Sequence, residues 1–216
     1  MLQVPDHEIA TAIAIAAGYL AGSLPFGYWL VRLAKGEDIR NAGSGNIGAS
    51  NVWRTYGRRY GIPVVLLDVA KGFVPAIIAT WLVGDLAGVL AGAAAMLGHW
   101  RPLFLRFEKG GKTVATAGGV FFGVAPLVGG VGLLVWIGVF LLGRYASLAS
   151  IVTALALPAV ALAIGEPWPV VAFAVLAAAV VVLLHRANIA RLAAGREHRF
   201  EIRRGRKPVR HAGPTT

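Results

Sequence analysis

The stretch that decides the fold is residues 113–143, TVATAGGVFFGVAPLVGGVGLLVWIGVFLLG, which contains no charged side chain. About 20 helical residues cross the roughly 30 Å hydrocarbon core of a bilayer, so this run of about 30 residues is long for one span. Pro126 and Gly129-Gly130 lie near its middle, and both are helix-breaking signals. The run therefore predicts two short spans, about 113–126 and 128–143.

Long apolar runs also occupy most of the remaining chain. Of the 216 residues, 57% are hydrophobic and the mean hydropathy is +0.68, whereas soluble domains are about 45–50% apolar. The sequence therefore predicts an all-α, polytopic integral membrane protein with about seven transmembrane helices. The predicted spans are about 8–33, 62–83, 86–99, 113–126, 128–143, 146–165 and 169–185.

Lysine and arginine gather on one side of this arrangement. With seven spans, the segment 34–60, the loop 100–112, Arg144 and the tail from residue 186 share one face and hold nearly every basic residue. Lysine and arginine remain on the cytoplasmic side of membrane proteins. We therefore expect a multi-pass protein of the cell inner membrane, with its N-terminus outside and its C-terminus cytoplasmic.

The charge balance restricts the partners. The formal net charge is +11, which suits anionic lipid or phosphorylated substrates. No nucleic-acid partner is expected, because no basic domain interleaved with aromatic residues is present. The absence of cysteine excludes disulfides and thiol nucleophiles. Residues 1–200 are expected to form a single transmembrane domain, and residues 201–216 a basic cytoplasmic tail.

Residues 43–51, GSGNIGASN, are the most informative polar stretch. Glycines allow tight turns with exposed N–H groups, and such a loop entering a helix can hold an anion. Arg40 and Arg54 flank it, and a guanidinium can donate two parallel hydrogen bonds to phosphate. A flexible interspan loop is the alternative interpretation. The candidate ligands here are Ser44, Gly45, Asn46, Gly48, Asn51 and Arg54.

The second stretch is the sequence KGGKT at residues 109–113, directly before an apolar helix. Small residues and cations at a helix N-terminus favour an anion site, although a positive flank of a membrane span has the same composition. The candidate phosphate ligands are Gly110, Gly111 and Lys112. His99, just upstream, is interpreted as structural.

The third stretch follows the last span. His185 and Asn188 are three residues apart, so they share one face of a helix. Within the second span, Asp68 and Lys71 have the same spacing and are predicted to form a structural ion pair, although Lys71 could instead reach a neighbouring site. On the predicted topology, all three polar stretches lie on the cytoplasmic face.

Together these stretches resemble the acyl-phosphate-dependent bacterial glycerol-3-phosphate acyltransferases of the PlsY type. The resemblance runs from GSLPFG (22–27) through GSGNIGASN, LDVAKGFVP (67–75) and GGKTVAT (110–116) to HRANIARLAAGREHRF (185–200). It implies transfer of a fatty acyl group from acyl phosphate to the 1-hydroxyl of sn-glycerol 3-phosphate. The products would be lysophosphatidate and phosphate, the first step of phospholipid synthesis.

The resemblance also implies roles for single residues. Ser44 and Arg54 would bind substrate, Lys112 would bind phosphate, and His185, Asn188 and Ser44 would be catalytic, while Glu197 would hold the third stretch together. Two positions depart from the family pattern, since Ser50 replaces a threonine and Thr113 replaces a glycine. Glu108 additionally lengthens the loop that leads to Lys112.

Several points stay open at the level of sequence. The general base is either His185 or the phosphate of the acceptor itself, and the oligomeric state is undetermined. No metal-ligand cluster is apparent, so no cofactor is expected and activity should persist in EDTA. An anion transporter and a scaffold for other lipid enzymes are the competing classes. A lateral opening between Gly/Ala-rich spans would admit an amphipathic acyl donor.

Overall fold

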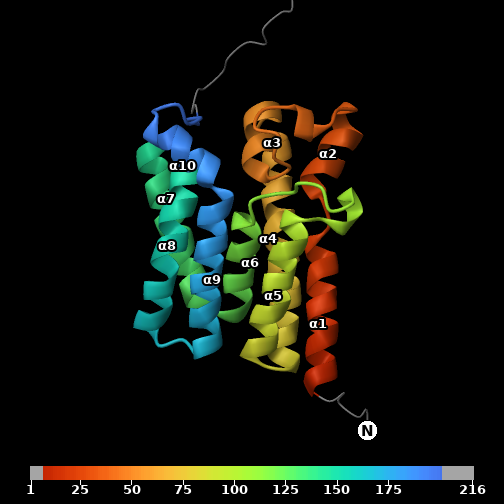
Figure 1. Ribbon diagram of the computed structural model, residues 1–216, viewed down its shortest axis with the longest axis vertical. Coiled ribbons are helices and arrows are strands. Elements are labelled where there is room, and N and C mark those ends of the chain that lie inside the picture. The colour runs from red at the N-terminus through yellow and green to blue at the C-terminus, as the bar shows by residue number, and fades with distance from the viewer. Residues whose placement is uncertain (1–6, 201–216) are drawn as a thin grey trace, which may run out of the picture.

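The computed structural model describes residues 7–200, and every element in that range is helical (Figure 1). The prediction of an all-α fold is confirmed, while the predicted tail, residues 201–216, lies outside the described residues. The α-helices are α1 (His7–Gly22), α2 (Phe26–Lys35), α3 (Ala49–Tyr56), α4 (Arg58–Leu82), α5 (Asp85–Trp100), α6 (Val114–Val124), α7 (Pro126–Gly143), α8 (Ala146–Ile164), α9 (Trp168–Leu184) and α10 (Arg186–Ala193). Two 3₁₀ turns are η1 (Ile39–Asn41) and η2 (Leu103–Leu105).

The break predicted within residues 113–143 is present, but its position differs by a residue or two. Helix α6 ends at Val124 and α7 begins at Pro126. Proline therefore opens the second helix instead of closing the first, because a first-turn residue has no helical acceptor for its missing N–H. Gly129 and Gly130 lie inside α7 and do not interrupt it.

The first predicted span, 8–33, is not one continuous helix. It is divided into α1 and α2 at Ser23 to Pro25. Proline lacks an N–H group and disfavours helical geometry in the residue before it, here Leu24. The segment 34–60 is also more ordered than a loop, because it contains η1 and α3, and α4 already begins at Arg58.

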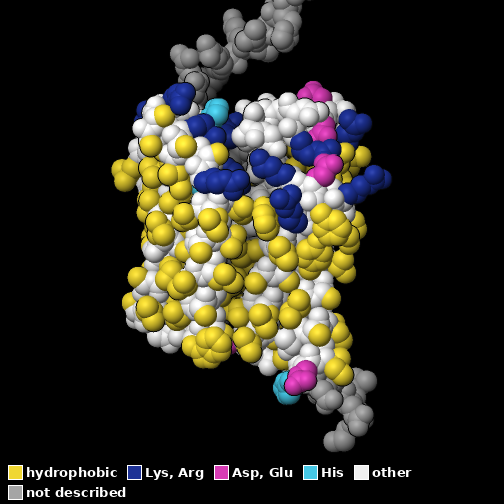
Figure 2. All heavy atoms as spheres, in the orientation of Figure 1, with side chains coloured by type: hydrophobic (Ala, Val, Ile, Leu, Met, Phe, Trp, Pro, Cys, Tyr) yellow, Lys and Arg dark blue, Asp and Glu magenta, His cyan; other side chains and the backbone are white. Residues whose placement is uncertain are grey.

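The apolar helices fit a membrane protein by length and composition. Within residues 7–200, four segments are long and apolar enough to cross a bilayer: α1 with α2, α4, α7 and α8. Helix α9, joined to α10 through a 61° bend, would be a fifth. Figure 2 shows hydrophobic side chains over most of the visible face, with Lys and Arg gathered at the end where Figure 1 places α2, α3 and α10.

Small residues bring α1, α4, α5 and α6 into close contact, as expected for Gly88 and Gly92. A methyl group on Gly92 would lie 2.3 Å from Val120 Cγ1, and one on Gly22 would lie 2.0 Å from the carbonyl oxygen of Ala95. Helices in lipid associate through this kind of close backbone packing, because lipid is as apolar as the side chains. The four helices form the platform that supports the polar loops.

Candidate active site

The first predicted stretch is a structured loop between η1 and α3. Gly43 and Gly45 have φ values of 59° and 68°, a region that glycine enters without a steric penalty. The buried amide of Asn51 ties the loop together. Its Oδ1 accepts from the Ser44 N–H at 2.8 Å, and its Nδ2 donates to two carbonyl groups of the same loop. These bonds argue against a flexible interspan loop.

Asn46 connects this loop to the second stretch. Its Oδ1 accepts from the Gly48 N–H at 2.8 Å, and its Nδ2 donates to the Gly110 carbonyl at 3.4 Å. Phosphate binding by Asn46 or Asn51 stays a prediction, and it would require some of these bonds to break. The contacts favour a loop-shaping role for both amides, which leaves exposed Ser44 and half-buried Arg54 as the freer groups.

Arg40 does not present an uncompensated charge to this loop. Its guanidinium bonds to Asp38 Oδ2 at 2.7 Å and contacts the carboxylate of Glu108. The hydrogen bonds from Arg40 lower the pKa of Asp38 below its usual value, in spite of some burial. Glu108, a departure from the family pattern, thus links the second loop to η1.

The two glycines of the second stretch are buried against α5. The Gly111 N–H donates to the His99 carbonyl and the Gly110 N–H to the Trp100 carbonyl, both at 2.9 Å. A methyl group on Gly111 would lie 1.8 Å from His99 Nε2, and one on Gly110 would lie 2.1 Å from the His99 oxygen. Their N–H groups were expected to bind phosphate, but the protein already uses them. Glycine is required here for close approach.

Lys112 follows these glycines and is surrounded by other cations. Its ammonium group contacts Asn188 Oδ1. Burial, together with the charges of Arg191, Lys109 and Arg54, lowers the pKa of Lys112 to about 8, and the carboxylate of Glu197 partly opposes this. Several positive charges in a partly desolvated space attract a phosphate dianion strongly.

Glu197 organises the third stretch. Its Oε1 accepts from Asn188 Nδ2 at 2.6 Å and from Ser147 Oγ at 2.8 Å, and its Oε2 accepts from Arg191 Nε at 2.7 Å. Burial raises the pKa of Glu197, but these hydrogen bonds outweigh it and the net pKa is lowered. The carboxylate therefore stays ionised and directs the Asn188 oxygen toward Lys112, a geometry compatible with the supporting role predicted for it.

His185 lies at the bend between α9 and α10, with only 4% of its surface exposed. Its Nδ1 is 2.8 Å from the Val181 carbonyl. A carbonyl can only accept, so Nδ1 carries the proton and Nε2 of the neutral ring has a free lone pair. That nitrogen can accept a hydrogen bond or a proton from a hydroxyl group.

The structure links the three stretches at one end of the bundle (Figure 1). Arg54 lies 5.6 Å from the Phe200 ring, and Trp53 also packs on Phe200, which joins α3 to the segment after α10. Phe200 and Ser147 were missed as contributors. An aromatic residue in a basic segment was a usable signal for Phe200, whereas nothing in the sequence singled out Ser147.

The backbone at Thr113 has a conformation that favours glycine, the residue that the family pattern has at this position. Its φ is 64° and its buried hydroxyl has no hydrogen-bond partner among residues 7–200. Left-handed backbone costs a residue with Cβ about 1–2 kcal/mol. We expect Thr113→Gly to stabilise the protein by about 1 kcal/mol, after the loss of methyl burial and the entropy of glycine are subtracted. Thermal unfolding in detergent measures this.

Thr116→Gly is the matched control for that substitution. Thr116 is also buried, and its hydroxyl has no partner in the described part of the chain, but it lies inside α6, where glycine costs about 1 kcal/mol. Equal destabilisation by both substitutions would contradict the strain assigned to Thr113.

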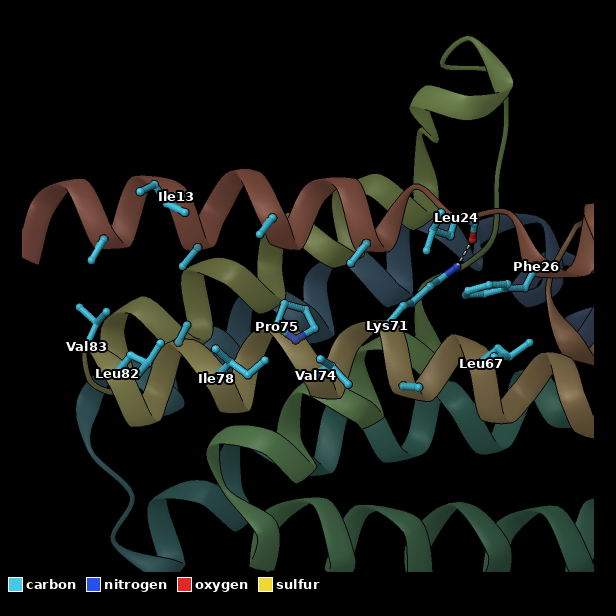
Figure 3. Close-up of a pocket in the computed structure, with 16 residues that line it drawn as sticks. Ile13, Leu24, Phe26, Leu67, Lys71, Val74, Pro75, Ile78, Leu82 and Val83 are labelled. Atoms are coloured by element: carbon cyan, nitrogen blue, oxygen red, sulfur yellow. Dashed lines mark hydrogen bonds between the residues drawn. The ribbon is translucent and has the colours of Figure 1, made fainter. Parts of the chain in front are cut away.

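An apolar groove runs along the outside of the bundle between α1 and α4 (Figure 3). It has a volume of about 800 Å³ and is lined by residues such as Ile13, Leu67, Val74 and Ile78. Lys71 lies toward one end and points to the Leu24 carbonyl. Since Lys71 also contacts His99, which packs under Gly111, the groove ends close to the second polar stretch.

Polar groups at one end of an apolar helical bundle, beside an apolar groove of about 800 Å³, are typical of an integral membrane enzyme. Comparison with known proteins agrees. The model of the family "Glycerol-3-phosphate acyltransferase" matches residues 12–195. The chain therefore belongs to the glycerol-3-phosphate acyltransferase family.

Individual relatives support the same assignment. A glycerol-3-phosphate acyltransferase of Aquifex aeolicus is 48% identical over 184 residues, covering 84% of this chain and 95% of the relative. One from Desulforudis audaxviator is 45% identical over 201 residues, covering 91% and 98%. The crystal structure of PlsY (YgiH), an integral membrane glycerol 3-phosphate acyltransferase in its glycerol 3-phosphate form, superposes with a TM-score of 0.85 at 45% identity. That comparison covers 88% of this chain and 96% of the other.

Proposed function

We propose that the protein transfers a fatty acyl group from acyl phosphate to the 1-hydroxyl of glycerol 3-phosphate and releases lysophosphatidate and phosphate. The observation that carries this proposal is the cation cluster of Lys112, Arg54 and Arg191 around Asn188 and Glu197. Both substrates bring phosphate to such a cluster. A PlsY structure in a lysophosphatidic acid form, with 42% identity and a TM-score of 0.80, supports the product.

We also propose that the chain has seven spans, with the site facing the cytoplasm across the inner membrane. The seven predicted spans correspond, within residues 7–200, to the helical runs α1–α2 and α4 to α9. Helix α1 begins at the end of the bundle opposite to α3 and α10 (Figure 1). Gathering of Lys and Arg at the α3–α10 end favours a cytoplasmic location for that end.

Acyl phosphate is a mixed anhydride with phosphate as a good leaving group, so the site must mainly orient the acceptor and neutralise developing charge. Lys112 binds the phosphate of glycerol 3-phosphate, and Lys112 and Arg54 together stabilise the oxyanion and the departing phosphate. Ser44 and Asn188 help to place the acceptor. The acceptor's own phosphate takes the proton of the 1-hydroxyl, while the free Nε2 of His185 accepts a hydrogen bond from the neighbouring 2-hydroxyl and so orients the acceptor.

His185→Gln tests this assignment of the proton acceptor. Because glutamine preserves hydrogen bonding but cannot take the proton, we expect kcat to fall less than about tenfold and KM to rise. Steady-state kinetics at saturating donor separate the two constants. A loss of about 1,000-fold or more in kcat, with KM unchanged, would make His185 the general base.

The donor assay tests the reaction itself. Purified protein is given glycerol 3-phosphate with palmitoyl phosphate, palmitoyl-CoA or palmitoyl-acyl carrier protein, in buffer containing EDTA. We expect lysophosphatidate from palmitoyl phosphate only. If lysophosphatidate forms from palmitoyl-CoA alone, the assignment of acyl phosphate as the donor is wrong. Phosphate flux in proteoliposomes without any acylated product would favour the transporter class.

We propose that the groove between α1 and α4 receives the acyl chain. It is apolar, opens along the outside of the bundle and ends near the second polar stretch. Ala70→Phe fills the groove near Lys71, so turnover of palmitoyl phosphate should fall about tenfold while a short-chain acyl phosphate is spared. Ala172→Phe, on the exposed side of α9, is the control. Equal loss for both chain lengths would reject the groove.

A further inference from the structure

A buried polar cluster lies beneath the second stretch, outside the groups assigned to catalysis. Asp68 and Lys71 of α4 and His99 of α5 are each less than 5% exposed. Lys71 Nζ lies 2.7 Å from Asp68 Oδ1, 3.0 Å from the Leu24 carbonyl and 2.6 Å from His99 Nδ1. An ammonium group has three N–H donors, so these contacts use all of them. The predicted ion pair is thus part of a larger cluster.

This cluster determines which nitrogen of His99 carries the proton. The Lys71 ammonium can only donate, so Nδ1 of His99 must accept and the proton of the neutral ring lies on Nε2. The Leu24 carbonyl is available to Lys71 because the chain breaks between α1 and α2. The orientation of the ring is therefore held by groups from α4 and by the break after α1.

The opposite edge of the ring supports the glycine turn. A methyl group on Gly111 would lie 1.8 Å from His99 Nε2 and 2.3 Å from Cε1, so no side chain fits between the ring and the turn. The Gly111 N–H bonds to the His99 carbonyl at 2.9 Å, and Asn46 donates to Gly110 from the other side. The position of Lys112, one residue further on, therefore depends on the ring.

We propose that Asp68, Lys71 and His99 are positioning residues. They hold the Gly110–Gly111 turn in the position in which Lys112 can contact the phosphate of glycerol 3-phosphate. The inference rests on the proposed function for its ligand. None of the three needs to touch substrate. A misplacement of about 1 Å at a charged contact can cost about 100-fold in rate. A small shift of the His99 ring, passed on to Lys112, is therefore enough to change binding and turnover.

A double-substitution cycle tests the contact between ring and turn. Gly111→Ala should weaken binding of glycerol 3-phosphate about tenfold, because the added methyl displaces the turn. His99→Asn keeps an acceptor for Lys71 and removes the ring edge, and should also weaken binding several-fold. The double variant should bind no worse than His99→Asn, since the methyl then has room. If the effects of the two substitutions on the Kd instead multiply in the double variant, the proposal is wrong.

A second measurement separates positioning from simple stability. Lys71→Met should raise the Kd for glycerol 3-phosphate about tenfold and should lower kcat as well, because Lys112 acts in both binding and turnover. It should also shift the ¹⁵N signals of the His99 ring because its tautomer is released. Thr80→Val, which removes a hydroxyl bonded to the Ala76 carbonyl on the same helix, is the control. A lower melting temperature with Kd and ¹⁵N signals unchanged would overturn the proposal.

The readouts also distinguish this inference from the proposed function. Binding of glycerol 3-phosphate by the wild-type chain needs no acyl donor, so the cycle remains informative if palmitoyl phosphate proves to be the wrong donor. Failure of the wild-type chain to bind glycerol 3-phosphate would instead reject the proposed function.

Discussion

Lys112→Met is expected to reduce kcat/KM for glycerol 3-phosphate about 100- to 1,000-fold. The lysine is the half-buried cation of the second stretch, and Asn188 holds its ammonium group. Removing a preorganised donor from developing negative charge costs about 2.7–4 kcal/mol. Steady-state kinetics on the detergent-purified protein measure the loss.

Lys109→Met is the matched control, since Lys109 is an exposed lysine of the same loop. Loss of a screened, exposed charge should change kcat/KM less than about threefold. Equal losses for the two variants would mean that the net charge of the loop, not the placement of Lys112, governs the reaction.

The pH dependence of glycerol 3-phosphate binding tests the role of Lys112 independently. Burial disfavours the charged form of Lys112, which puts its pKa at about 8. The lysine is thus protonated at neutral pH and loses its charge as the pH rises through about 8. The Kd for glycerol 3-phosphate should rise above that pH in the wild type and stay flat in Lys112→Met. A wild-type Kd that is flat to well above pH 8 would contradict the assignment.

Glu197→Gln is expected to cost about 2–4 kcal/mol of stability and about 100-fold in kcat/KM. The side chain of Glu197 is 3% exposed and accepts from Asn188, Ser147 and Arg191. Glutamine loses the charge and turns an NH₂ group toward one of these donors, leaving unsatisfied polar groups. Asn188 then no longer directs Lys112.

Thermal unfolding and kinetics on the folded fraction separate the two effects of this substitution. Glu166→Gln, in the turn between α8 and α9, is the control and should change neither. A folded Glu197→Gln protein with wild-type kcat/KM would show that the carboxylate serves stability alone.

The sequence by itself determined the helical membrane architecture, the break between α6 and α7 and the family. These features are local. An apolar run, a proline or a cluster of Lys and Arg determines the structure or the orientation of the segment in which it occurs. The residues Lys112, Asn188 and Glu197 could also be selected from the sequence through the resemblance to the family. Composition alone did not select them, since a positive flank of a membrane span looks the same as an anion site.

Only the tertiary structure decided what the polar groups bond to. Asn46, Asn51 and the N–H groups of Gly110 and Gly111 resembled phosphate ligands in sequence, yet they bond to the backbone of their own loop or of neighbouring segments. His99 was interpreted as structural, and its place beneath Gly111 became visible only in three dimensions. The physical reason is that a hydrogen bond is satisfied by whichever partner folding brings close, and these partners come from separate helices and loops.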